Sequence, residues 1–491
     1  MAGKVIIIGA GIAGLECAYI LLKNGYDVSV LEHDKQAGGC LQTFRRNGNN
    51  FDTGFHYVGG LDESQPLNRL FGYFNLLDLP WHQLDRDCFD EVVIGDQSYP
   101  FAQGHENFVK QLTYYFPKQK DNLSRFTQIL KSTGEHLFDA FLPHEAEQFY
   151  SESLFAKSAY QFLEDITDDP LLRQVLSATS LKMELNKNLP LYTFAQLHNS
   201  FIDSAWRLQG GGAQLIEHLV EDISRMGGSV TCMQTVTSIV ERQGKVIGVR
   251  VNKDTFLSAD YVIFSAHPQE MLRLLIDSET IRNIYRKRIS NLKDTFGMFT
   301  ANIVLKPHTV PYLNRNLYIH KPATDLWNVD TSEVRSVLVN YYLPTDDSSY
   351  SPAVDILTPM RWQQVARWAN TRQGHRGEDY VRFKEQVTDQ CLELVDKRLP
   401  HLKQAIEHIY TSTPLSYNYY TLTHHGTAFG IQKDWQSPIT TILTPKTPIQ
   451  NLYMTGQNLN LHGILGTTMT SFLTCAELIG INKLRKDLKL K

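Results

Sequence analysis

Three glycines near the N-terminus, Gly9, Gly11 and Gly14, have the spacing G-x-G-x-x-G, and the acidic residue Glu32 follows them. In this spacing one glycine permits a tight turn, one lets backbone N–H groups approach a pyrophosphate, and one lets the following helix pack closely. A carboxylate about twenty residues beyond the glycines can accept hydrogen bonds from ribose hydroxyls. These four residues therefore predict a dinucleotide-binding site.

The elements around the glycines have the order that such a site needs. A run of β-branched residues at 5–8 predicts a buried parallel strand, and a helix is predicted at about 13–24. The positive end of that helix would lie at the phosphates, which places Ile12 and Ala13 beside the dinucleotide. A second predicted strand at 27–31 ends at the acidic residue. A simple glycine-rich turn would not need this whole arrangement.

A second glycine-rich run follows closely behind the first. It begins with Gly38, Gly39 and Cys40 and continues through the segment 51–60, whose sequence is FDTGFHYVGG. Nicotinamide dinucleotide sites have no need of a second run, whereas FAD needs backbone without side chains beside its ribityl chain and ring. The run therefore predicts FAD as the cofactor, in contact with both glycines, Cys40 and His56. We interpret Cys40 as a small buried residue rather than as a redox group.

These motifs resemble those of the carotenoid desaturases and retinol saturases, a family of FAD-dependent oxidoreductases within the amine-oxidase-like flavoproteins. The FDTG-x-HY-x-GG form is more similar to the retinol saturase branch, because phytoene desaturases tend to have Gly-Pro-Thr at positions 54–56. The resemblance implies an α/β fold in which a Rossmann-type FAD-binding domain, with a parallel sheet and a β-meander, is interleaved with a mixed α+β substrate-binding domain. The implied ranges are 1–75, 205–270 and 440–485 for the FAD-binding domain, 76–204 and 271–439 for the substrate-binding domain, and 486–491 for a tail.

Two later segments complete the predicted flavin site. Near 205–266, a glycine-rich turn, an amphipathic helix, short alternating strands and a buried strand follow one another. The resemblance implies that the backbone of Val236, in this segment, contacts adenine. Near 451–478, a strand ends in Gly456 and Gln457, and a helix follows. Many related flavoproteins carry an acid after the strand glycine, but the Gln457 amide can also bind ribityl hydroxyls.

The helix of the second segment is expected to face the flavin. Free N–H groups and the partial positive charge at its N-terminus would stabilise the negative charge of reduced flavin. Thr467 or Thr468 is a fitting N-terminal residue for this helix. Gly466 and Thr467 are therefore expected to contact the cofactor.

The implied reaction moves a hydride between flavin N5 and one carbon of a double bond, and a proton to or from the neighbouring carbon. No obvious acid–base pair stands out in the sequence. His56 is the first candidate, because its loop should lie beside the flavin ring and a histidine with a pKa near neutrality can donate a proton. Tyr57 and His462 are weaker candidates.

The resemblance implies a long apolar polyene or isoprenoid as the substrate. Aromatic residues in the predicted substrate-binding domain form either a substrate wall or, more simply, the core of a helical cap. They are Phe138, Phe141, Phe149, Tyr150, Phe155, Tyr160 and Phe162. Tyr419, Tyr420, His424 and His425 could line a channel, although polar loop residues are the simpler interpretation. Adjacent histidines point apart and have no third ligand at a suitable spacing, so no metal site is predicted. His267 is interpreted as a satisfied loop histidine.

Composition agrees with a globular enzyme of two domains. The chain has 491 residues and a net charge of −4, which argues against nucleic acid as a partner. Six cysteines without CxxC pairing argue against a disulfide framework and favour a reducing compartment. The sequence contains no run of 18 apolar residues, so no membrane-spanning helix is predicted. We expect a cytoplasmic protein. The end of the chain at 483–491 is basic and contains leucines, so peripheral membrane contact is left open. The simpler interpretation of this end is a solvated, frayed helix end.

Three other functions remain open. A flavin-dependent polyene cis–trans isomerase would use reduced FAD without net redox change, and an amine or porphyrinogen oxidase would share the fold. A non-enzymatic escort of prenyl lipids, like the GDP-dissociation inhibitors, would have a related fold without FAD, but the intact glycine runs argue against it. Only one dinucleotide motif is present. The electron donor or acceptor is therefore not predicted, and the sequence equally predicts neither the direction of reaction, nor the bond acted on, nor the oligomeric state.

Overall fold

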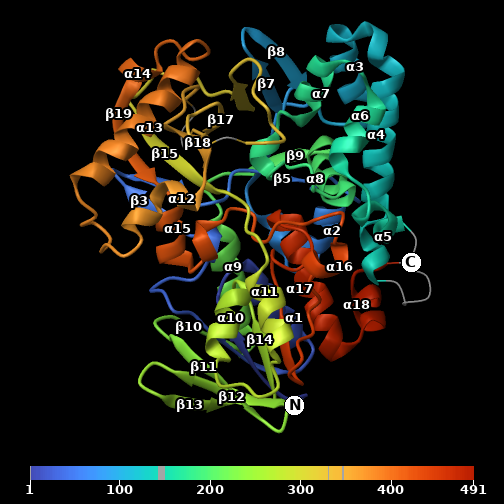
Figure 1. Ribbon diagram of the computed structural model, residues 1–491, viewed down its shortest axis with the longest axis vertical. Coiled ribbons are helices and arrows are strands. Elements are labelled where there is room, and N and C mark those ends of the chain that lie inside the picture. The colour runs from blue at the N-terminus through green and yellow to red at the C-terminus, as the bar shows by residue number, and fades with distance from the viewer. Residues whose placement is uncertain (1, 142–149, 330, 345–347, 491) are drawn as a thin grey trace.

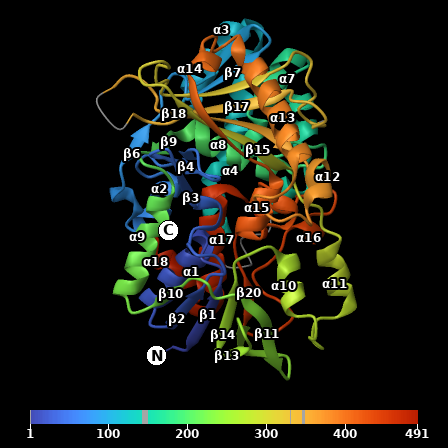
Figure 2. The ribbon, with the colours of Figure 1, turned by 90° about the vertical axis from the view of Figure 1, so that its left-hand side faces the viewer.

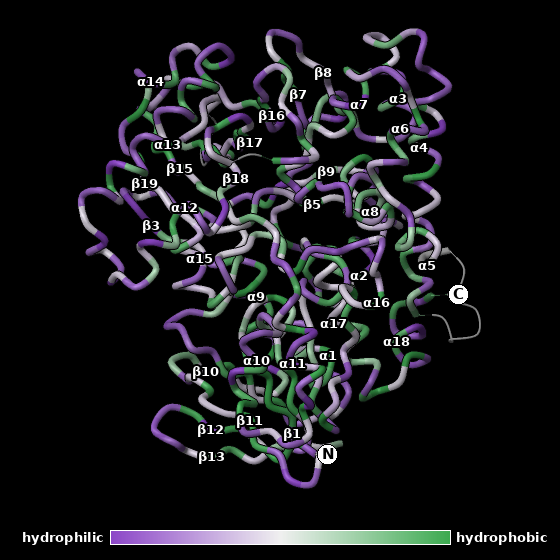
Figure 3. The backbone as a smooth tube through the Cα atoms, viewed as in Figure 1, coloured by the Kyte–Doolittle hydropathy of each residue, from purple (hydrophilic) through white to green (hydrophobic). Residues whose placement is uncertain are grey.

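The computed structural model describes residues 2–141, 150–329, 331–344 and 348–490. The molecule has two halves, each built around one large sheet (Figure 1). The lower half contains a parallel five-stranded sheet, and the upper half contains a mixed seven-stranded sheet. Hydrophobic residues gather inside both halves, whereas outer loops are hydrophilic (Figure 3). The fold class predicted from the sequence is confirmed.

The five-stranded sheet is parallel throughout and follows from the β-branched runs in the sequence. Its strands, in spatial order, are β10 (Ser229–Thr231), β2 (Asp27–Leu31), β1 (Lys4–Ile8), β14 (Tyr261–Phe264) and β20 (Leu452–Met454). Ile8 at the end of β1 lies opposite Leu31 and Phe264, so the carboxyl ends of these strands meet at one edge. In open parallel sheets ligands bind at this edge.

Helices cover the parallel sheet on the side of α1 (Ile12–Lys23), which follows β1 directly. Both α9 (Ala213–Arg225) and α17 (Gly463–Ile479) pack against α1, and α18 (Ile481–Asp487) packs beside α17. The leucines Leu484 and Leu488 at this end of the chain are buried. The expectation of a solvated, frayed C-terminal end is therefore wrong, because these side chains belong to the hydrophobic core of the lower half.

A β-meander and two helices lie at the other side of the sheet. The meander contains β11 (Val236–Arg242), β12 (Lys245–Val251) and β13 (Thr255–Ser258), paired antiparallel in that order. After β14 the chain forms α10 (Pro268–Leu274) and α11 (Asn283–Ser290). The hydrophobic side chains of these elements form a separate core cluster with those of β1 and β14.

The upper sheet has only one parallel pair, between β7 and β16, and its other neighbours are antiparallel. Its strands in spatial order are β19 (Ile406–Ser412), β15 (Gly297–Leu305), β18 (Ala353–Met360), β17 (Ser336–Tyr341), β16 (Asn316–His320), β7 (Asp90–Ile94) and β8 (Gln97–Phe101). The long helix α13 (Glu378–Asp396) lies across this sheet (Figure 2). The short elements around it are α12 (Trp362–Val365), α14 (Leu402–Ala405) and α15 (Pro414–Thr421), whereas α16 (Pro438–Thr441) is hydrogen-bonded to Arg288 of α11.

A layer of helices stands beside the β7–β8 end of the upper sheet (Figure 1). It contains α3 (His105–Tyr115), α4 (Lys120–Glu135), α5 (Tyr150–Phe155), α6 (Ala159–Ile166), α7 (Pro170–Ser177) and α8 (Leu191–Asp203). The remaining elements are α2 (Pro66–Tyr73), the hairpin of β3 (Thr43–Arg46) and β4 (Asn49–Asp52), and the small sheet of β5 (Val58–Gly59), β9 (Ala205–Leu208) and β6 (Trp81–Gln83). Of the aromatic residues singled out in the sequence, Phe141 and Phe155 are buried core residues, whereas Phe149 lies outside the described residues.

Two segments cross side by side between the halves of the molecule. The Thr295 N–H donates to the Gly430 carbonyl at 2.9 Å, and the Ala428 N–H donates to the Phe296 carbonyl at 2.9 Å. These bonds join 293–296 and 427–432 into a short antiparallel ribbon, which also contains a bridge between Asp294 and Ile431. The strands of each sheet come from the ranges predicted for the two domains, while the boundaries themselves stay a prediction.

Candidate active site

A cavity of about 350 Å³ lies at the carboxyl edge of the parallel sheet, with walls from both halves of the molecule. Most of the residues predicted to bind FAD line it. They are Gly9, Gly11, Ile12, Ala13, Glu32, Gly38, Gly39, Cys40, His56, Val236, Gly456, Gln457 and Thr467. Residues from four parts of the chain, 9–13, 32–56, 236 and 456–467, thus meet around one cavity. Its volume is usual for a ligand-binding site.

The two glycine-rich runs form adjoining parts of the cavity wall. A Cβ atom added to Gly11 would have no heavy-atom neighbour within 4 Å and would project into open space, and Gly9 has a φ of +102° that favours glycine. A Cβ atom on Gly14 would lie 2.1 Å from the Gly9 carbonyl oxygen, so Gly14 permits close packing of α1 on β1 and does not line the cavity. The Gly38 N–H donates to the Ala10 carbonyl at 2.8 Å, which joins the second run to the first.

Glu32 is held by the backbone at the end of β2. Its carboxylate accepts hydrogen bonds from the N–H groups of Ala10 at 2.8 Å and Asp34 at 2.9 Å, and it contacts His33 at 2.7 Å. Burial alone would raise the pKa of Glu32, but these hydrogen bonds lower it below its ordinary value. The carboxylate is therefore ionised at neutral pH and has spare lone pairs for ribose hydroxyls.

The N-terminus of α17 faces the cavity, as predicted, but the helix begins earlier than expected. Its first residues, Gly463 and Ile464, line the cavity, and His462 is the N-cap residue without a side-chain capping bond. The expectation that Thr467 or Thr468 begins the helix is wrong, because both lie within it. A Cβ atom on Gly466 would lie 2.4 Å from the Leu461 carbonyl oxygen, so this glycine permits a close turn and does not itself line the cavity.

Unsatisfied polar atoms in the cavity wall show where a polar ligand would bind. His56 Nδ1 and Ser265 Oγ are buried and have no hydrogen-bond partner among the described residues. Burial, with a smaller contribution from Arg207, lowers the pKa of His56 to about 4, so its imidazole is neutral at pH 7. Together with the open space beside Gly11 and the free N–H groups of α17, these atoms fit FAD.

Tyr57 and His462 lie behind the cavity wall. The Tyr57 hydroxyl donates to Asp90 at 2.9 Å and is 2.7 Å from the Tyr318 hydroxyl, within a buried network that includes an ion pair of Lys182 and Asp90 at 2.6 Å. His462 Nε2 is 3.2 Å from the Lys182 carbonyl oxygen. Burial lowers the pKa of His462 to about 4. Neither residue reaches the cavity directly.

The upper half lines the cavity with uncharged residues only, among those that the structure describes. Its apolar contribution comes from β15, β17, β18 and nearby loops, and consists of Leu181, Met298, Leu338, Leu357, Leu422, Ala428 and Phe429. Tyr417, Tyr420 and several threonines add hydroxyl groups. Among the described aromatic residues at 138–162, none lines the cavity, and the burial of Phe141 and Phe155 agrees with the simpler interpretation of a helical core.

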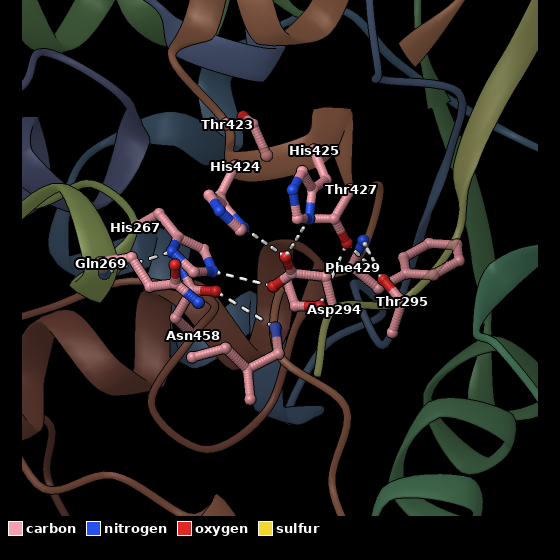
Figure 4. A network of polar contacts seen from close by, with 12 residues as sticks. His267, Gln269, Asp294, Thr295, Thr423, His424, His425, Thr427, Phe429 and Asn458 are labelled. Atoms are coloured by element: carbon pink, nitrogen blue, oxygen red, sulfur yellow. Dashed lines mark hydrogen bonds and ion pairs between the residues drawn. The ribbon is translucent and has the colours of Figure 1, made fainter. Parts of the chain in front are cut away.

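One cluster was missed by sequence reasoning. His267 Nε2 lies 3.0 Å from Asp294 Oδ1, and His424 Nδ1 lies 2.5 Å from Asp294 Oδ2 (Figure 4). His425 Nδ1 is 3.4 Å from the same oxygen. The expectation that the adjacent histidines point apart is wrong, because His425 has a φ of +52° and both rings turn to one side. Burial would raise the pKa of Asp294, but the hydrogen bonds from the histidines lower it to about 2.

The comparison with known proteins agrees with this geometry. A profile of the family described as flavin containing amine oxidoreductase matches residues 12–479. The chain belongs to this family, and it is an FAD-dependent oxidoreductase. Membership in an enzyme family sets aside the non-enzymatic escort that the sequence had left open.

Among individual relatives, the chain is similar to all-trans-retinol 13,14-reductase of Rattus norvegicus, with 26% identity over 99% of this chain and 86% of the relative. It is also similar to prolycopene isomerase 2 of an Oncidium hybrid cultivar, with 23% identity over 93% of this chain and 81% of the relative. The crystal structure of an oxidoreductase from Methanosarcina mazei shares the fold, with a TM-score of 0.64, 16% identity, and coverage of 95% of this chain and 98% of that chain. The predicted resemblance to the retinol saturase and carotenoid desaturase branch is confirmed.

Proposed function

We propose that the protein transfers hydrogen between FAD and a carbon–carbon double bond of a long apolar polyene or isoprenoid lipid. The observation that carries the proposal is the apolar part of the cavity, which includes Leu181, Met298, Leu338, Leu357 and Phe429. A cationic amine would need a carboxylate or a comparable partner there. No charged side chain from the upper half lines the described cavity, so that half offers a cationic amine no carboxylate partner.

FAD, when bound, supplies hydride transfer. The glycine turns would hold the pyrophosphate, and the Glu32 carboxylate would accept hydrogen bonds from the ribose hydroxyls. The N-terminus of α17 would face the flavin ring. The residues proposed to contact the cofactor are therefore those predicted from the sequence, with Gly14 and Gly466 acting through backbone packing. The apolar wall would hold the alkene flat and exclude water.

His56 is better suited to binding the cofactor than to donating a proton. Its pKa of about 4 means that the protonated ring is scarce at neutral pH. Its unpartnered Nδ1 atom can instead form a hydrogen bond with FAD. Tyr57 and His462 would act on the reaction only by supporting the wall, since neither reaches the cavity.

Double-bond reduction is the first candidate reaction, because the chain is similar along its whole length to proteins named all-trans-retinol 13,14-reductase. Isomerisation is the second, because prolycopene isomerases are also similar to it. Anaerobic absorbance with a panel of polyenes separates them. Reoxidation of dithionite-reduced flavin by a polyene would support reduction, and bleaching of oxidised flavin would support dehydrogenation. A change of polyene geometry with the flavin still reduced would support isomerisation, and no response to any polyene would refute the proposed substrate class.

An apolar substrate would reach the cavity from a membrane. Tyr420 and Leu422, which line the cavity, are 39% and 37% exposed, and the neighbouring Tyr419 is 54% exposed. We propose that this exposed face of α15 and the loop after it contacts the membrane peripherally. No helix within the described ranges is long and apolar enough to span a bilayer. Co-flotation with liposomes, reduced in a Tyr419→Ser, Leu422→Ser double variant, would support the contact, and equal flotation of both proteins would refute it.

A further inference from the structure

The cluster around Asp294 draws nitrogen and oxygen atoms from three separate parts of the chain to one point. His267 precedes α10 in the lower half, Asp294 lies on the ribbon that crosses between the halves, and His424 and His425 follow α15 (Figure 4). The rings of His267 and His424 are stacked, with centroids 5.1 Å apart. The proposed hydrogen transfer between FAD and a double bond uses none of these four side chains.

We propose that His267, Asp294 and His424 bind a divalent transition-metal ion of the zinc type, with His425 as the fourth ligand. Imidazole nitrogen and carboxylate oxygen are the ligands that zinc takes in proteins. Ligand atoms of His267, Asp294 and His424 all lie within 4.8 Å of one another. Zinc bonds of about 2.0–2.1 Å at tetrahedral angles place ligand atoms roughly 3.3 Å apart. His267 Nε2 lies 3.0 Å from Asp294 Oδ1, and His425 Nδ1 lies 3.4 Å from Asp294 Oδ2, so each separation from the nearer carboxylate oxygen is close to that value.

Binding requires a rearrangement of the cluster, because its ligand atoms lie within 4.8 Å of one another rather than at the spacing expected around zinc. The separation between His424 and Asp294, 2.5 Å, has to widen by less than 1 Å. The metal can bind His267 Nε2 only after the proton that this nitrogen shares with Asp294 has left it. His267 Nδ1 accepts a long hydrogen bond of 3.3 Å from the Gln269 N–H, and a metal-bound ring would carry a proton there instead. The metal-bound His267 ring would then lack a hydrogen-bond acceptor for its Nδ1 proton. Loss of such a partner behind a metal ligand costs roughly 10–100-fold in metal affinity, so a site with four ligands would bind more weakly but would still bind.

The ion would have a structural role rather than a place in the flavin reaction. Of the four ligands, only His267 lines the cavity. The side chain of His425 is 47% exposed, so an ion would reach the cluster from solvent. Once bound, it would join the start of α10 to the crossing ribbon and to the loop after α15. Residues of all three segments line the cavity.

Metal titration of the tag-free, FAD-loaded protein tests this site without any assay of turnover. After dialysis against EDTA, the protein is titrated with Zn²⁺ in competition with a chromogenic chelator, and with Co²⁺ to record its visible absorption bands. We expect one ion per chain and cobalt bands typical of tetrahedral coordination. The variants Asp294→Asn and His424→Asn should each lose at least 100-fold in affinity, because a direct ligand matters more than an outer partner.

The chain offers a matched control. His218 and Asp222 form a single His–Asp pair on α9, 3.4 Å apart, without a second histidine ligand. The variant His218→Asn should therefore bind Zn²⁺ as the wild type does. Flavin absorbance verifies that each variant is folded. Absence of stoichiometric Zn²⁺ and Co²⁺ binding by the wild type would overturn the proposal and leave a hydrogen-bonded cluster. Equal affinities of the wild type and a folded Asp294→Asn variant would overturn it as well.

Discussion

Glu16 should make the stability of the protein fall as pH rises, and its replacement by glutamine should remove that dependence. The side chain is fully buried between α1 and α17. Its carboxyl group accepts hydrogen bonds from the hydroxyls of Thr468 at 2.7 Å and Ser471 at 2.9 Å. Burial raises the pKa of Glu16 from 4.5 to about 8, and the two hydroxyls offset only part of that rise.

The sign and size of the effect follow from linkage. A carboxyl with a raised pKa in the folded state contributes its full stability below pH 4.5, and that contribution is lost as pH rises toward about 8. Each pH unit in this window removes about 1.4 kcal/mol, so two units remove about 2.7 kcal/mol. A chain of this length has an unfolding entropy of roughly 1 kcal/mol/K, which converts the loss to about 2–3 °C in Tm.

Thermal unfolding of the FAD-loaded wild type and of Glu16→Gln at pH 5.5 and pH 7.5 measures this difference. Glutamine keeps an oxygen for Thr468 or Ser471 but cannot ionise. From pH 5.5 to pH 7.5, the Tm of the wild type should therefore fall by about 2–3 °C more than the Tm of Glu16→Gln. Other groups that titrate in the same range cancel in the comparison. Glu217, exposed on α9, gives the matched control, and Glu217→Gln should follow the wild type. Parallel Tm curves of wild type and Glu16→Gln would refute the reasoning.

Four further predictions concern the cavity and its wall. Gly11→Ala should lower FAD affinity at least tenfold because its Cβ projects into the cavity, whereas Gly72→Ala, whose Cβ makes an ordinary contact, should leave the flavin-to-protein absorbance ratio unchanged. Glu32→Gln should weaken FAD binding about tenfold, because hydrogen bonds to a charged acceptor are stronger by about 1–2 kcal/mol, and an unchanged titration of apoprotein with FAD would contradict the ribose contact. Leu357→Trp should lower turnover of a long polyene more than that of a short one, and equal losses would argue against an apolar chamber. Tyr57→Phe should lower the free energy of unfolding by about 1–3 kcal/mol, because a buried carboxylate loses a donor, and a shifted flavin spectrum would contradict its place behind the wall.

Local sequence patterns predicted many of the residues that line the cavity. Gly9, Gly11, Gly14 and Glu32 belong to one short strand–turn–helix–strand unit, in which spacing along the chain determines position in space. Gly456 could be placed because a strand ending in glycine has few structural uses. The relation of these segments to one cavity depended on family resemblance, since no local pattern shows which strands are neighbours.

Other features depended on contacts between distant residues. The convergence of His267 and His424 on Asp294 spans more than a hundred residues, and the left-handed backbone of His425 has no local sequence signal. The pKa of His56 was expected near neutrality, but burial among residues from several segments lowers it. The start of α17 was misplaced at Thr467 because a capping preference is weaker than the packing of that helix on α1.

The order of strands in the parallel sheet has a consequence for biosynthesis. β1 and β2 are made first, but β14 joins them after more than two hundred further residues, and β20 completes the edge only near residue 454. The helix α17, whose N-terminus lines the cavity, is synthesised later still. A nascent chain therefore exposes an unfinished sheet edge for most of its synthesis, and such edges promote association between chains. The residues that line the cavity run from Ile8 to Thr467, so the cavity is complete only in a nearly full-length polypeptide, and flavin bound there would mark such chains.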